Sequence, residues 1–203
     1  MLHFQGYGKN LIKTFKASPD AWVQMIKQLA FYRLFSRPGI TYESCQTRKF
    51  LLGRTEVIRS ASSEAKAFCL AMIDPKTSDS EREKLLRKAV TRHIQYSTWA
   101  ADAQGVDRHM FGLRRLVKDG EEMPEVFKEE VFGRSSHWEM STSQLSSKYL
   151  DGWGYGEGEW GLLSWMSMVR LWDIADGSSC GGRIWVVVRD QRRLAAVVRD
   201  DEE

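Results

Sequence analysis

The chain has 203 residues, of which 42% are hydrophobic and 28% charged, and its net charge is +3. This composition is typical of a globular protein, and the length suits one domain with an appended segment. No run approaches the ~20 apolar residues of a membrane span, and the first residues lack the apolar core of a signal peptide. Three widely spaced cysteines (Cys45, Cys69 and Cys180) without a C-x-x-C pair predict neither a disulfide framework nor a zinc site.

The charge is uneven, because residues 1–60 contain ten basic and three acidic side chains, a local charge of +7. A basic segment attracts polyanions. The aromatic pattern or reading helix of a nucleic-acid-binding module is absent, however, and a phosphorylated small molecule fits the charge as well.

In the first part of the chain, Ser18-Pro19-Asp20 is a helix start signal, and Arg37-Pro38-Gly39 ends the apolar pattern that follows it. Strands are predicted at Ile40–Ser44 and Glu56–Arg59, where β-branched or aromatic residues alternate with polar ones. A short helix is predicted at Glu64–Met72.

The longest predicted helix begins at the capping-box sequence that starts at Ser78, and its 3.6-residue period continues to about Ala103. Further helices are predicted at Val106–Val117 and Pro124–Phe132, and a strand at Trp138–Ser141. Mixed helices and strands indicate the α/β class.

The last segment, 157–203, contains no Lys, Phe, Tyr, Pro, Thr or His, but it holds four tryptophans and six arginines. This composition indicates a GC-rich stretch that is translated out of frame or through an intron. The sequence therefore predicts a domain over 1–156 and an atypical tail over 157–203. The alternative is a lineage-specific domain in which Arg183–Arg189 is a genuine strand.

Four sequence blocks, in this order and at these spacings, resemble the carboxy-terminal half of the carnitine/choline acyltransferase family: Thr41-Tyr42-Glu43-Ser44, Gly53-Arg54-Thr55-Glu56, Asp107-Arg108-His109 and Ser141-Thr142-Ser143-Gln144. The resemblance is dense from Tyr7 to Tyr155 and is closest to the fungal-type carnitine O-acetyltransferases. It implies a CoA-dependent acyltransferase-like fold, a sheet flanked by helices, here incomplete at both ends.

The family reaction is the reversible transfer of a short acyl group between coenzyme A and carnitine, a step in fatty acid metabolism. A histidine acts as general base, acetyl-CoA is a substrate rather than a bound cofactor, and no metal takes part. The family's catalytic histidine lies in the amino-terminal half, and no histidine of this chain matches it (His3, His93, His109 and His137). We therefore expect the chain to be inactive by itself and to need an amino-terminal half. The alternatives are a non-catalytic CoA- or carnitine-binding module and a non-functional gene-model fragment.

By resemblance, Tyr42, Thr55 and Arg108 bind the carboxylate of carnitine. Arginine supplies positive charge, and two hydroxyl groups supply directed hydrogen bonds. Choline has no carboxylate, so this combination favours carnitine over choline as substrate. For Arg108 alone, the alternative is a structural ion pair with Asp107 or a nearby glutamate.

The Ser-Thr-Ser block has matching roles in the family. Ser143 donates a hydrogen bond to the oxyanion of the tetrahedral intermediate, and one such donor commonly contributes ~3 kcal/mol to catalysis. Ser141 helps to order the carnitine end of the site, and Gln144 lies along coenzyme A. Without the other three blocks, this stretch would be read as an ordinary turn or strand edge.

Lys9 and Lys13 are spaced i, i+4, so a helix places them on one face, and the resemblance assigns them the 3′-phosphate of coenzyme A. Their alternative is a solvated lysine face. Asp20 matches a coenzyme-contact position, and its alternative is a carboxylate favoured by the helix dipole.

Two aromatic residues complete the expected site. Trp153 fills the position that gates the acyl pocket in the family, which predicts a short acyl group. Tyr155 matches an aromatic position near the trimethylammonium group, where a ring face attracts the cation by ~0.5–2 kcal/mol. The family suggests a mitochondrial or peroxisomal location, with the cytoplasm as the alternative, and the sequence itself names no compartment.

Overall fold

The computed structural model describes residues 7–143 and 166–168 of the chain. These residues form seven helices and four strands: α1 (Lys9–Thr14), α2 (Pro19–Phe35), β1 (Thr41–Gln46), β2 (Thr55–Ile58), α3 (Ser63–Ile73), α4 (Asp79–Ala101), α5 (Asp107–Arg115), α6 (Glu125–Lys128), α7 (Glu130–Ser135), β3 (Met140–Ser143) and β4 (Met166–Met168).

The strands form one mixed sheet in the order β2-β1-β3-β4. Strands β1 and β2 are an antiparallel pair, whereas β3 runs parallel to both β1 and β4. A parallel pair needs a long crossover, and helices α3 to α7 lie in the chain between β2 and β3. The α/β class expected from the sequence is confirmed.

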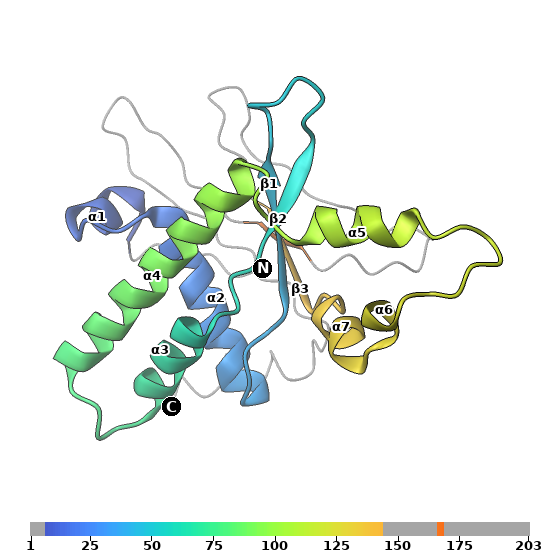
Figure 1. Cartoon of the computed structure of the whole chain (residues 1–203). Helices are drawn as coiled ribbons and strands as arrows, with labels where there is room; N and C mark the ends of the chain where they lie inside the picture. The colour runs from blue at the N-terminus through green and yellow to red at the C-terminus, as the bar shows by residue number, and fades with distance from the viewer. Residues whose placement is uncertain (1–6, 144–165, 169–203) are drawn as a thin grey trace, which may run out of the picture.

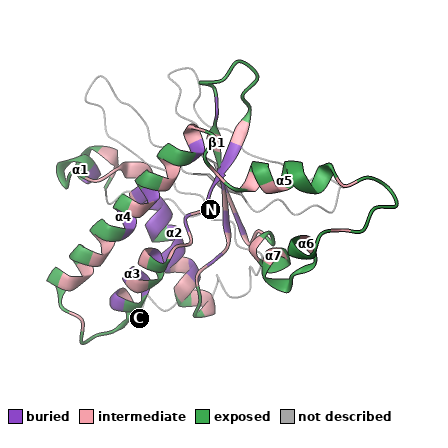
Figure 2. Cartoon of the chain, viewed as in Figure 1, coloured by how far each residue is buried: buried purple, intermediate pink, exposed green. Residues whose placement is uncertain are grey.

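The helices lie on both sides of this sheet (Figure 1). Helices α1 to α4 gather on one side, and α5 to α7 lie on the other. The core is built where α2, α3 and α4 meet, from Ala21, Met25, Leu29, Ala65, Phe68, Cys69, Ala89 and Val90. Burial is concentrated along α2 and the strands, whereas α5, α6 and α7 have no buried residues (Figure 2).

Local chemistry explains the ends of the main helices. Ser18 caps α2 by accepting a hydrogen bond from the amide of Ala21, and Ser78 caps α4 in the same way from Glu81. Helix α2 ends at Ser36, which has a left-handed φ of 56°, two residues before Pro38. The predicted starts of both helices are therefore confirmed.

One predicted helix is wrong. The stretch 124–132 does not form a single helix, because Glu129 has φ −59° and ψ 131° and separates α6 from α7. Strand β3 also begins two residues later than predicted, at Met140.

The strand β4 belongs to the segment 157–203, and it pairs through Ser167 with Thr142 of β3. The domain boundary after residue 156 and the origin of the tail stay predictions. Within the described ranges, no helix is both long and apolar enough to cross a membrane.

Candidate functional site

The guanidinium group of Arg108 is the centre of the candidate site. It belongs to the first turn of α5, and its Nη2 donates hydrogen bonds to the hydroxyl of Tyr42 at 3.0 Å and to Oγ1 of Thr55 at 3.1 Å. Its Nε donates to the carbonyl oxygen of Thr55 at 3.0 Å. The structure thus brings together three side chains from β1, β2 and α5 that the sequence analysis assigned to carboxylate binding.

The ring of Tyr42 is held from two directions. Trp138 packs edge-on against it, with 5.5 Å between the ring centroids, and the Arg108 guanidinium carbon lies 5.9 Å from the ring centre. These contacts hold the phenol of Tyr42 beside the guanidinium of Arg108.

Helix α5, which carries Arg108, starts without a side-chain cap of its own at Val106. The carboxylate of Glu56 takes this place, because both of its oxygens accept from the amide of Arg108 at 3.3 Å and one accepts from the amide of Val57 at 2.7 Å. Gly105 makes the approach possible, since a Cβ there would lie 2.5 Å from Cδ of Glu56. The buried carboxylate therefore ties the start of α5 to β2.

Asp107 does not pair with Arg108. It forms a two-pronged ion pair with Arg59, whose Nε and Nη2 donate at 2.9 and 2.6 Å. Burial works against the charged guanidinium of Arg59, but the hydrogen bond to Asp107 raises its pKa above the ordinary value. In the part of the chain that the structure describes, Arg108 has no ion pair with any carboxylate, so the ion-pair alternative for Arg108 is wrong there.

An open pocket of about 600 Å³ adjoins Arg108 and Thr55. Apolar side chains contribute to its wall beside these polar groups, and its lining residues are Thr47, Phe50, Leu52, Gly53, Arg54, Thr55, Ala103, Arg108 and Phe111. A larger hollow of about 700 Å³ lies along α4 and shares no residue with it. The smaller pocket is lined by two arginines, Arg54 and Arg108, and guanidinium groups can donate charge-assisted hydrogen bonds to a small ligand that carries a carboxylate.

The Ser-Thr-Ser block lies on the strand next to Tyr42. Ser141 is half-buried, and it is the register partner of Tyr42 in the parallel pair β1–β3. Ser143 is the last residue of β3 and is paired with Met168 of β4. The side chain of Ser143, and all of Gln144, Trp153 and Tyr155, lie outside the described residues.

The residues expected at coenzyme A are divided between two elements. Lys9 and Lys13 both belong to α1, where Lys13 is exposed and Lys9 is half-buried. Asp20 lies instead in the first turn of α2 and faces a buried polar cluster. Its carboxylate therefore has a helix-terminal position and a side-chain partner.

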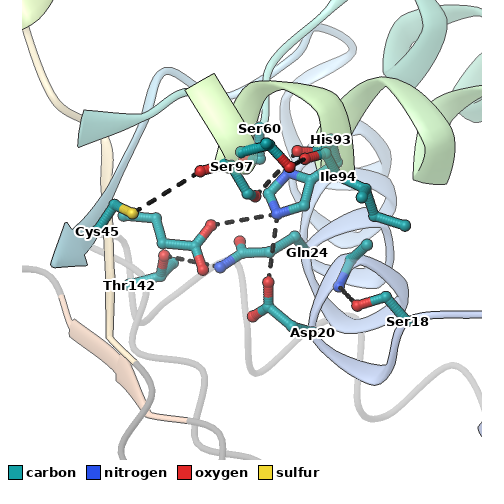
Figure 3. Close-up of polar contacts among 12 residues, drawn as sticks. Ser18, Asp20, Gln24, Cys45, Ser60, His93, Ile94, Ser97 and Thr142 are labelled. Carbon is teal, nitrogen blue, oxygen red and sulfur yellow. Dashed lines mark hydrogen bonds and ion pairs between the residues drawn. The ribbon is translucent and has the colours of Figure 1, made fainter. Parts of the chain in front are cut away.

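The buried polar cluster comprises Asp20, Gln24, Lys27, Glu43 and His93. Figure 3 shows Asp20, Gln24 and His93 of this cluster. Nε2 of His93 lies 3.4 Å from Oδ2 of Asp20 and 3.4 Å from Oε2 of Glu43. The sequence analysis gave His93 no role, yet it is only 3% exposed. It falls three and four residues after Val90 and Ala89, which are also buried, so the helical period contained the signal.

Burial sets the proton affinities in this cluster. It raises the pKa of Glu43 well above the usual value, and the charge of Asp20 adds to the effect. For Asp20, burial is outweighed by the hydrogen bond and charge of His93, so its pKa is lowered. Burial also lowers the pKa of Lys27 to about 8, against the attraction of the two carboxylates.

The same cluster is the place where the described residues could hold a metal ion. One ligand atom each from Asp20, Glu43 and His93 lies within 4.8 Å of the others. The ammonium group of Lys27 already supplies positive charge to both carboxylates, so the donor set has a built-in competitor for a cation.

Comparison with known proteins shows the family of the chain. Residues 1–158 match the choline/carnitine O-acyltransferase family. The chain is 42% identical over 149 residues to carnitine O-acetyltransferase of Rattus norvegicus, an alignment that covers 73% of the chain and 24% of the relative. It is 40% identical over 156 residues to mitochondrial carnitine O-acetyltransferase of Saccharomyces cerevisiae, covering 76% and 23%.

A choline O-acetyltransferase, that of Gallus gallus, is 43% identical over 145 residues, covering 70% of the chain and 23% of the relative. The chain thus spans about a quarter of the length of the relatives that it matches. Because the family match extends over most of the chain and includes the three elements β1, β2 and α5 that build the Arg108 site, the chain belongs to the choline/carnitine O-acyltransferase family.

Proposed function

We propose that the chain carries the carnitine-binding part of a carnitine O-acetyltransferase, which transfers a short acyl group reversibly between coenzyme A and carnitine. One observation carries this proposal: Arg108 is flanked by the hydroxyls of Tyr42 and Thr55 at 3.0 and 3.1 Å and has no carboxylate partner among the described residues. The two hydroxyls accept from Arg108, and each keeps its own O–H to donate. A guanidinium beside two such hydroxyls suits a carboxylate, to which it can donate charge-assisted hydrogen bonds.

The choice between carnitine and choline depends on this geometry. Identity to the two kinds of relative, 42% and 43%, does not separate the two substrates. Carnitine and choline share a trimethylammonium group, but only carnitine has a carboxylate. A site with a cation at its centre favours the ligand that can neutralise it.

The remaining roles follow from the same proposal. Ser143 stabilises the oxyanion, Ser141 orders carnitine, and Lys9, Lys13, Asp20 and Gln144 contact coenzyme A. Trp153 limits the acyl group to a short one, and Tyr155 faces the trimethylammonium group. The name of the yeast relative supports a mitochondrial location.

The proposal assigns the general base to a part of the enzyme other than the described residues. His93 is 3% exposed and its Nε2 faces Asp20 and Glu43, so the proposal gives it no part in the reaction. Chain-alone turnover, measured as carnitine-dependent release of thiol from acetyl-CoA, would contradict this assignment.

The test of binding is titration calorimetry of the chain with carnitine and, separately, with choline. Arg108→Ala should weaken carnitine binding at least about tenfold, because each charge-assisted hydrogen bond contributes ~1.5–3 kcal/mol. Arg114→Ala is the matched control, since it removes another exposed arginine from α5. The carnitine affinity of Arg114→Ala should stay within about twofold of that of the wild type, because Arg114 lies outside the pocket.

Two results would contradict the proposal. One is an equal affinity of the wild-type chain for carnitine and choline. The other is the same loss of carnitine affinity in Arg108→Ala and Arg114→Ala.

A further inference from the structure

Helix α2 projects two buried glutamine side chains toward the sheet, one helical turn apart. Gln24 is 3% exposed and Gln28 is 1% exposed. Gln28 holds the segment that leads into β1, because its amide nitrogen donates to the carbonyl of Gly39 at 2.9 Å and to Oγ1 of Thr41 at 2.7 Å. Gln24 reaches the neighbouring strand β3, where its amide nitrogen donates to Oγ1 of Thr142 at 3.0 Å (Figure 3).

The hydroxyl of Thr142 connects three elements. It accepts the hydrogen bond from Gln24 and donates one to the carbonyl oxygen of Tyr42 at 3.3 Å. Because Thr142 is only 1% exposed, water cannot replace either partner without opening the core. One hydroxyl therefore joins α2, β3 and β1.

This bond lies at the point that determines the register of the Ser-Thr-Ser block. Thr142 is paired with the buried residue Glu43, and Ser141 is paired with Tyr42. Side chains alternate between the two faces of a strand, so a slip of one residue would turn Ser141 away from the face of Tyr42.

Backbone pairing on both sides also holds strand β3 in this register. Three residue pairs join it to β1 and three join it to β4, and Glu139 anchors its start by accepting from the amide of Ile40 at 3.0 Å. The Gln24–Thr142 bond holds the middle of the strand, between the anchor at Glu139 and the chain beyond Ser143.

We propose that Gln24 is a positioning residue of the site: through Thr142 it fixes Ser141 beside Tyr42, so that both can order the ligand held by Arg108. The inference rests on the proposed carnitine-binding function. Gln24 touches no ligand in this account, and it acts through the register of β3.

The experiment uses the full chain and compares three single variants and one double variant, Gln24→Met with Thr142→Val, for carnitine affinity by calorimetry. Gln24→Met and Thr142→Val each remove one side of the bond at nearly constant volume, and each should weaken carnitine binding about tenfold. Thr142→Ser keeps the hydroxyl and should restore affinity to within about threefold of the wild type. The double variant should bind no more weakly than the worse single variant, because both changes break the same link.

Leu29→Ala is the control for a general loss of stability. Leu29 belongs to the same helix and to the core between α2, α3 and α4, and its truncation should cost about 2–5 kcal/mol without removing a bond to β3. At a temperature well below the unfolding midpoint of every variant, Leu29→Ala should bind carnitine as the wild type does.

Amide hydrogen exchange gives a second measurement that needs no ligand. Exchange in residues 140–143 should become faster in Gln24→Met and Thr142→Val, whereas exchange in α3 should not change.

Wild-type carnitine affinity in both Gln24→Met and Thr142→Val, or an equal loss of affinity in Leu29→Ala, would overturn the inference while leaving the carnitine site intact. If Arg108→Ala also leaves affinity unchanged, the proposed function itself fails. Unchanged hydrogen exchange at residues 140–143 in Gln24→Met and Thr142→Val would show that Gln24 does not hold β3.

Discussion

At the scale of single residues, the orientation of Arg108 depends on Glu56, Gly105 and Arg59, to which the sequence analysis assigned no role. Glu56 caps the start of α5, Gly105 leaves room for that carboxylate, and Arg59 holds Asp107 away from Arg108. Arg108 keeps its donors for the hydroxyls of Tyr42 and Thr55 as a result. The geometry of the site is thus set by neighbours that do not line it directly.

The first prediction concerns Gly105. Gly105→Ala places a methyl group 2.5 Å from Cδ of Glu56, which must move and release the amide of Arg108. We expect a loss of about 1–3 kcal/mol in the free energy of unfolding, together with weaker carnitine binding. Urea unfolding and calorimetry measure the two effects.

Gly112→Ala is the matched control, because a Cβ at Gly112 meets nothing within 4 Å. It lies inside α5, so alanine should stabilise the helix by up to about 1 kcal/mol. Equal stability of the two alanine variants would show that Glu56 adjusts without cost.

The sequence analysis placed Tyr42, Thr55 and Arg108 in one group by resemblance to a family. No spacing rule predicts that these residues meet, since Arg108 is separated from the other two by more than fifty positions. The roles of Glu56 and Gly105 could not be predicted, because a close approach between two chain segments leaves no periodic trace in either of them.

At the scale of elements, the helices with a polar cap were predicted well, and the one with an interior break was not. The break at Glu129 lets the rings of Phe127 and Phe132 pack edge-to-face, with their centroids 5.2 Å apart. On a continuous helix, residues five positions apart do not face each other, because neighbours are three or four residues apart. The pattern read along the sequence did not reveal this break between two short helices.

The second prediction tests the cap of α4. Ser78→Ala removes the oxygen that accepts from the amide of Glu81 at 3.3 Å, and it should lower the free energy of unfolding by about 1 kcal/mol. Thermal unfolding measures the effect. Ser80→Ala changes an exposed serine of the same first turn and should be nearly neutral. A cap that contributes little would give both variants the same midpoint.

At the scale of the whole molecule, the fold encloses a charged cluster between α2, α4 and β1. Glu43 and His93 are buried, and the positive charge of Lys27 offsets the negative charge of their neighbour Asp20. Burying charge costs free energy unless the groups are paired or neutralised. Protonation of Glu43 and deprotonation of Lys27 both reduce that cost, which links the stability of the fold to pH.

The third prediction concerns this link. The pKa of Lys27 is lowered from 10.5 in the unfolded chain to about 8 in the fold, so between these values the unfolded chain binds more protons. The contribution of Lys27 to stability therefore rises with pH in this window, by about 1 kcal/mol between pH 8 and pH 9. Urea unfolding at both pH values measures it.

Lys27→Met should remove this rise, whereas Lys66→Met, which changes an exposed lysine of α3, should retain it. The relevant quantity is the difference between the two pH values for each variant, so a constant loss of stability in Lys27→Met does not affect the comparison. The same pH dependence in both variants would exclude Lys27 as its source.

The sequence by itself determined the helix starts at Ser18 and Ser78, the α/β class and the family, because caps, apolar periods and motifs are local patterns that can be read along the chain. Only the tertiary structure decided how Arg108 is presented, how Gln24 holds Thr142 and which charges are buried together around His93. These features depend on distances between segments that are far apart in the chain, and such distances exist only after α2, α4 and α5 have packed around the sheet.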